Sequence, residues 1–87
     1  MIPCTTNEII FNVRRCTKLK LDEKTAQIIL EDSDYLEIYR RLIARYDRMT
    51  SEKMKTAPEL IKKNEINLFN KILGEFDDMV AQILLSN

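Results

Sequence analysis

Histidine is absent from this chain of 87 residues, and the sequence holds one glycine, two prolines and two cysteines. Histidine is the side chain that most often transfers protons at neutral pH, and cysteine catalysis needs a base beside the thiol. A structural zinc site needs four Cys or His ligands, and a phosphate-binding loop needs several glycines. We therefore expect no enzyme activity, no catalytic residues, no metal and no other cofactor.

The scarcity of glycine and proline also bears on the fold, because tight turns between strands are built largely from these residues. Apolar residues make up 45% of the chain and charged residues 32%, which is typical of a folded globular domain. A chain of this length has room for one domain only. We therefore predict an all-α fold, a small helical bundle that occupies residues 1–87 as a single domain.

Neither sign of charge is in excess, since 14 Lys and Arg balance 14 Asp and Glu. No overall field draws the chain toward nucleic acid or membrane. No apolar run is long enough to span a bilayer. The first residues have neither the basic region nor the apolar region of a signal peptide. We expect an intracellular protein, cytoplasmic or nuclear, in which Cys4 and Cys16 are reduced and Cys16 is a small core residue.

Helix start signals divide the sequence into about four helices. Thr5 and Thr56 are each followed after three residues by glutamate, the pattern of a capping box, and Asp22 is a further N-cap candidate. Asp34 or Ser33 can cap the third helix. The predicted helices span residues near 6–19, 23–31, 34–54 and 58–85.

A tyrosine-rich stripe marks the third predicted helix. Spacings of four, three, four and three residues place on one face Tyr35, Tyr39, Leu42, Tyr46 and Met49. Tyrosine combines an apolar ring with a hydroxyl that needs a partner, so it is common where one side is apolar and the other wet. We therefore predict that the three tyrosines belong to an interface.

The last predicted helix carries a second apolar stripe, which consists of Phe69, Ile72, Phe76, Met79 and Ile83 and is flanked by Leu68, Leu73, Val80 and Leu84. One continuous helix, about 42 Å long and antiparallel to the third, is favoured over two shorter ones. Gly74 in its middle indicates a kink or a close helix crossing. The apolar arc is wider than one facing helix covers, so Val80 and Leu84 are predicted to serve association, and polar changes there to leave the monomer folded.

The only compact basic group comprises Arg40, Arg41, Arg45 and Arg48, and the last three share the face opposite the tyrosines. Such a face could contact the phosphates of a nucleic acid. The helix that carries it begins with Asp34 and Glu37, which would oppose a negatively charged backbone. Nucleic-acid binding through this face is therefore an alternative hypothesis and not the preferred one.

Residues 38–45, Ile-Tyr-Arg-Arg-Leu-Ile-Ala-Arg, resemble the Leu-Tyr-Arg motif of the small helical mitochondrial assembly factors named after it. The resemblance covers eight residues of 87, has Ile38 in place of leucine, and lies in mid-chain, whereas that family carries the motif near its start. We therefore transfer no function from it.

Protein–protein interaction is the function that these features favour. The supporting features are the missing catalytic residues, the balanced charge, and more apolar helix face than a short second helix can cover. We expect a regulatory, adaptor or assembly subunit that docks another protein or a second copy of itself. The predicted interface residues are Tyr35, Tyr39, Tyr46, Val80 and Leu84. A nucleic-acid-binding module and a small inhibitor that masks another protein's site are the alternatives.

Overall fold

Five α-helices and no strand make up the part of the chain that the structure, a computed structural model, describes, residues 4–86. In chain order they are α1 (Thr6–Cys16), α2 (Glu23–Glu31), α3 (Ser33–Met49), α4 (Glu52–Lys55) and α5 (Glu59–Ser86). The predicted all-α fold is confirmed. The helix count differs from four because the third predicted helix is divided into α3 and the single turn α4.

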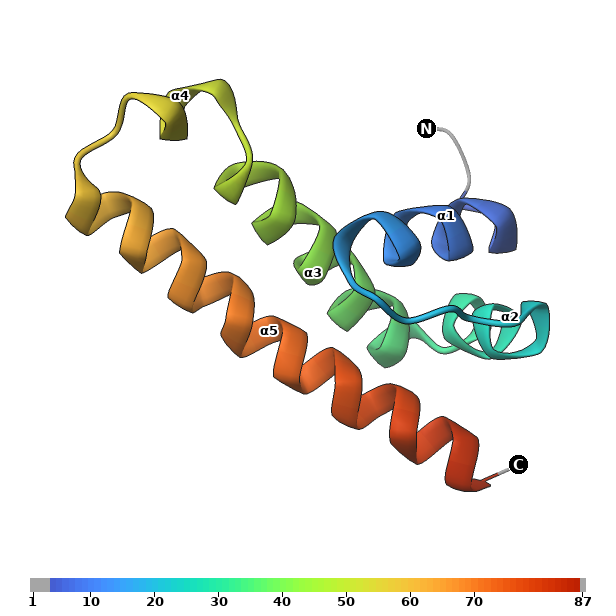
Figure 1. The fold of residues 1–87 in the computed structure, drawn as a ribbon. Helices are drawn as coiled ribbons and strands as arrows, with labels where there is room; N and C mark the ends of the chain where they lie inside the picture. Colours follow the sequence, from blue (N-terminus) through green and yellow to red (C-terminus); the bar gives the residue numbers. More distant parts are fainter. Residues whose placement is uncertain (1–3, 87) are drawn as a thin grey trace.

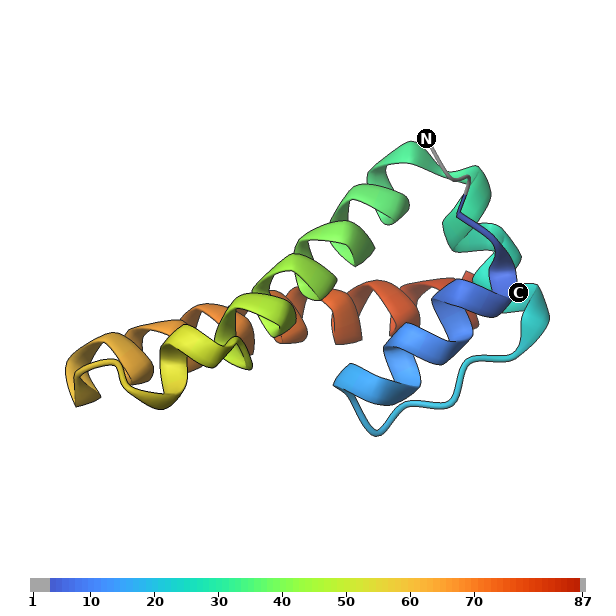
Figure 2. The same ribbon diagram turned by 90° about the horizontal axis from the view of Figure 1, so that it is seen from above.

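The long C-terminal helix α5 runs antiparallel to α3, as the sequence predicts, and these two helices share the most extensive contact in the molecule. Helices α1 and α2 pack on each other and on α3, at the end where α3 begins and α5 finishes (Figure 1). Helix α4 lies at the opposite end. Figure 2 shows the consequence, a two-helix hairpin that projects beyond α1 and α2.

The core gathers apolar side chains from α1, α2, α3 and α5. The largest fully buried side chains are Phe76, Ile9, Ile29, Leu42 and Val13. The stripe predicted for the last helix is confirmed, since all five of its members are buried. Because each of these helices contributes to one cluster, the position of the α3–α5 hairpin is fixed by the packing of α1 and α2 against its base.

The first helix ends three residues before its predicted limit, at Cys16. The Thr17 hydroxyl donates to the carbonyl of Val13 at 2.9 Å, and its oxygen accepts from the Leu19 amide at 2.9 Å. Thr17 is thereby held in an extended conformation, with φ −136° and ψ 179°. This local competition by a short hydroxyl side chain stops the helix although the apolar spacing would allow it to continue.

Similar chemistry ends α3 at Met49, where the sequence predicts a helix as far as residue 54. The hydroxyls of Thr50 and Ser51 donate to the carbonyls of Tyr46 and Arg48, at 2.8 and 3.0 Å. Ser51 is extended, with φ −67° and ψ 158°, and precedes α4 as its N-cap residue. The chain therefore turns here, and α4 links the two long helices.

Two of the predicted helix caps are confirmed and two are wrong. Thr5 accepts from the Glu8 amide at 3.2 Å, and Asp22 accepts from the Thr25 amide at 2.7 Å. Helix α3 is capped by Asp32, which accepts from two amides, and not by Ser33 or Asp34. Thr56 is the residue after α4, and α5 begins at Glu59, with the Pro58 carbonyl accepting from the amides of Ile61 and Lys62. At α3 the neighbouring Asp32 carboxylate reaches the free amides first.

Gly74 lies within an uninterrupted α5, so the predicted single helix is confirmed, and the glycine marks no close crossing. A Cβ atom at this position would meet nothing within 4 Å. Glycine in a helix costs about 1 kcal/mol relative to alanine. We therefore expect Gly74→Ala to raise the free energy of unfolding by about 1 kcal/mol, measured by urea denaturation. The exposed Ala81→Gly change on the same helix is the control and should lower it similarly.

Candidate functional site

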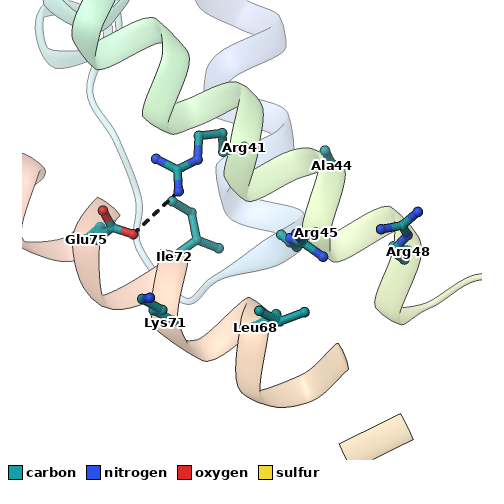
Figure 3. A pocket seen from close by; sticks show the side chains of 8 residues that line it. All are labelled: Arg41, Ala44, Arg45, Arg48, Leu68, Lys71, Ile72 and Glu75. Carbon is teal, nitrogen blue, oxygen red and sulfur yellow. Dashed lines mark ion pairs between the residues drawn. The ribbon is translucent and has the colours of Figure 1, made fainter. Parts of the chain in front are cut away.

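A groove of 560 Å³ runs between α3 and α5 on the side of the hairpin that carries the arginines (Figure 3). Its lining consists of Arg41, Ala44, Arg45 and Arg48 from α3 and Leu68, Lys71, Ile72 and Glu75 from α5. Spacings of three and four residues place each set on one side of its helix. The result is a concave surface with four cationic side chains, one carboxylate in its lining and an apolar floor.

Two ion pairs link the walls of this α3–α5 groove. A guanidinium nitrogen of Arg41 lies 3.9 Å from a carboxylate oxygen of Glu75, and both side chains are about half exposed. A nitrogen of Arg45 lies 3.8 Å from Oε2 of Glu65. Exposed pairs of this length contribute less than about 1 kcal/mol, because water competes for both charges. The Arg41 pair can therefore be exchanged for another carboxylate at little cost.

The carboxylate of Glu65 lies deeper than that of Glu75. Its Oε2 atom is buried and receives no hydrogen bond from residues 4–86, and its charge is met only by Arg45. A buried charge that loses its counter-ion is costly. Arg45 is thus needed to neutralise Glu65 within the hairpin and is not free to bind a partner.

Arg48 and Lys71, by contrast, are exposed and form no ion pair within the described part of the chain. They project from opposite helices and line the same groove (Figure 3). Together with the weakly paired Arg41 they leave the groove with positive charge that no side chain of residues 4–86 neutralises. This excess is local, since the whole chain has no net charge.

Arg40 does not belong to this site, so the predicted basic group is divided. Its side chain is exposed and does not line the groove. A step of one residue turns a helical side chain by about 100°, which moves Arg40 away from Arg41. The three arginines predicted to share a face do line one groove.

The tyrosine stripe faces the interior of the molecule. Tyr39 is only 4% exposed, and its hydroxyl accepts from the Asn12 amide at 3.0 Å. Tyr46 is half-buried between the Phe69 ring, at 5.8 Å between centroids, and the Arg15 guanidinium, 5.0 Å from its ring centre. Tyr35 is half-buried against the core. The prediction that Tyr39 is available to a partner is therefore wrong, because α1 already covers this face.

The two predicted interface residues of the last helix have opposite environments. Val80 is 5% exposed and belongs to the core, so its assignment to an association surface is corrected. The apolar arc is wide because α2 as well as α3 packs on α5. Leu84 is 58% exposed and is accessible to another molecule.

Further exposed apolar residues gather in the first ten residues of α5, and these are Leu60, Ile61, Ile66 and Leu68. At 3.6 residues per turn, Ile61 and Leu68 share one side of the helix, while Leu60 and Ile66 lie on two others. Helices α1 and α2 lie at the other end of α5 (Figure 1), so its neighbours here are α3 and the segment around α4, where Met54 lines a pocket with Lys62 and Ile66. The first half of α5 therefore has four apolar side chains that residues 4–86 leave at least 40% exposed.

Neither cysteine has the surroundings of a reactive thiol. Both are free, and Cys16 is buried, as predicted. Burial raises the pKa of the Cys16 thiol, and burial together with the neighbouring Glu8 raises the pKa of Cys4. No three His, Cys, Asp or Glu side chains in residues 4–86 are placed to hold a metal ion. Over the same residues, no helix combines the length and apolar character needed to cross a bilayer.

Sequence reasoning missed Lys71 and Leu68 as parts of the groove. The sequence indicates that these two residues line the groove only once the two long helices are paired, because both lie on a different helix from the arginines. Given an antiparallel hairpin, the spacing of Leu68, Lys71 and Glu75 on one side of α5 would place them beside Arg41 and Arg48.

The groove and the exposed residues beside it are suited to recognition. Guanidinium and ammonium groups bind carboxylates or phosphates, and Leu68 with Ile72 provides an apolar floor. No family model, no curated protein and no solved structure matches this chain. A function is therefore assigned from the chemistry of the groove.

Proposed function

We propose that this chain is a non-enzymatic protein-binding module whose projecting α3–α5 hairpin docks another protein or a second copy. The observation that carries the proposal is the exposure of four large aliphatic side chains within the first ten residues of α5. These side chains share the segment with six polar residues, and exposed apolar surface concentrated in one segment marks an interaction site. A partner would cover the first half of α5 as α1 and α2 cover its second half.

The shape of the molecule supports the same proposal. The described residues extend over 44 × 29 × 21 Å, and the long dimension follows the hairpin. A projecting pair of helices presents both of its faces and its end to a partner, whereas its base is held by α1 and α2. Two helices alone bury little apolar surface, so association at this end adds to the core as well as joining two molecules.

Photo-crosslinking tests this proposal. A photoreactive residue at Leu68 is expected to give a discrete adduct, at twice the chain mass for self-association or at another mass for a different protein. The same residue at Lys24, which is exposed on α2, is the control and should give none. The adduct should disappear when Leu60→Ser and Ile61→Ser are added, with helicity unchanged by circular dichroism. An adduct that persists in this variant, or equal labelling from Lys24, contradicts the proposal.

A further inference from the structure

We infer that the α3–α5 groove binds an acidic amphipathic helix of a partner protein. This inference rests on the proposed function and names the chemistry of the segment that docks. Its starting point is the charge of the groove, in which Arg48 and Lys71 form no ion pair with residues 4–86 and Arg41 is weakly paired. A partner with carboxylates at matching positions would neutralise all three.

Two rows of side chains run along the hairpin on this side. The basic row consists of Arg41, Arg45 and Arg48 on α3, and the apolar row consists of Ile61 and Leu68 on α5, with Asn64 and Glu65 between them, so each row extends over seven residue steps. Each span corresponds to about 10 Å, or two helical turns. The rows are held side by side by the ion pair from Arg45 to Glu65.

A helix is the partner element that matches these two rows. Apolar side chains at positions i, i+3 or i+4, and i+7 form a stripe of the same length as the apolar row. Carboxylates on the two flanks of that helix would then lie over Arg41 and Arg48 on one wall of the groove and over Lys71 on the other. Helix-in-groove recognition uses this combination, in which the apolar stripe provides affinity and the charges fix orientation.

The same groove suits a nucleic acid less well. Leu68 is 40% exposed on the floor, where a phosphate backbone gives it no apolar partner. The Glu75 carboxylate lines the groove, and a phosphate would be repelled by it. A side chain of an amphipathic helix can cover Leu68, and its carboxylates can be spaced to avoid Glu75.

Fluorescence anisotropy with synthetic helical peptides tests the inference. The probe is a labelled, monomeric peptide of about three heptads with one leucine stripe flanked by glutamates. Its matched controls carry glutamine or lysine in place of the glutamates. We expect the glutamate peptide to bind, the glutamine peptide to bind about tenfold more weakly and the lysine peptide not to bind. Equal binding of the glutamate and glutamine peptides overturns the inference.

Charge reversal identifies the surface that binds. Arg48→Glu with Lys71→Glu is expected to weaken binding of the glutamate peptide by at least about tenfold, equivalent to about 1.4 kcal/mol. Arg40→Glu with Lys20→Glu changes the net charge equally, outside the groove, and should leave binding nearly unchanged. Arg45 is kept in both variants because Glu65 depends on it. Equal losses in the two variants would show that only net charge matters, and the inference would fail.

Labelled duplex and single-stranded DNA complete the experiment under the same conditions. We expect neither DNA to bind at micromolar protein. The inference would be overturned in favour of a nucleic acid if DNA bound more tightly than the glutamate peptide and if this DNA binding were lost in the Arg48→Glu, Lys71→Glu variant. The crosslinking result separates the two proposals. A specific adduct at Leu68 without peptide binding would leave the module a protein binder whose partner is not an acidic helix. Loss of the adduct as well would remove the proposed function.

Discussion

Val80→Glu is expected to unfold this chain, whereas Leu84→Glu, one helical turn further along α5, is expected to leave it folded. Val80 is 5% exposed within the core, and a carboxylate there would be buried without a counter-ion. Such substitutions cost more than about 4 kcal/mol, which is comparable with the whole stability of a domain of this size. Leu84 is 58% exposed, so its charge would remain in water.

Circular dichroism of the two variants and the wild type measures this difference directly. Because both changes introduce the same residue into the same helix, the change in net charge is matched, and helix propensity alone would favour Val80→Glu. A folded Val80→Glu variant with wild-type stability would mean that α2 and α3 do not enclose this part of α5. Unfolding of Leu84→Glu would mean that Leu84 is buried in solution.

Phe76→Ala is expected to lower the free energy of unfolding by about 3–5 kcal/mol. The ring is fully buried at the centre of the core, where its removal would leave a cavity among side chains from several helices. Phe11→Ala is the control, because Phe11 is 65% exposed on α1 and its loss should change stability by less than about 1 kcal/mol. Urea denaturation of both variants tests the comparison. Similar losses at the two positions would contradict the packing described here.

Apolar spacing predicts the helices of this fold well because packing against a common core requires a regular stripe. The range of α2 follows from the sequence at both ends, since Asp22 caps its start and an acidic cluster after Leu30 breaks its apolar pattern. The buried stripe of α5 follows likewise from residues at spacings of three and four. The length of α5 was predicted to within one residue at each end.

Helix ends set by local hydroxyl groups were not predicted. Thr17, Thr50 and Ser51 each interrupt or end a helix through side-chain hydrogen bonds to the backbone. Threonine and serine also occur inside helices, so their presence alone does not distinguish a stop from a continuing turn. The same ambiguity affected the cap of α3, where three neighbouring residues could accept the amides and Asp32 does so.

The candidate site was predictable only in part, because a sequence shows which residues share a helix face but not which helix covers that face. The arginine face was identified correctly for Arg41, Arg45 and Arg48. The tyrosine face has the composition of an interface, and in this structure it is an internal one, covered by α1 through Asn12 and Arg15. The exposed residues at the start of α5 stand out only when the positions of α1 and α2 are known.

The uneven cover of α5 has a consequence for its dynamics. Its second half is enclosed by α2 and α3, while its first half has one long neighbour, so the helix does not open as a single unit. Opening of the hairpin end exposes little buried apolar surface, whereas opening near Phe76 requires the whole core to separate. We therefore expect amide protons of the first turns of α5 to exchange with solvent through local opening, which costs less free energy than global unfolding. A partner bound at this end, as proposed, would close that route, so recognition would also order the hairpin locally.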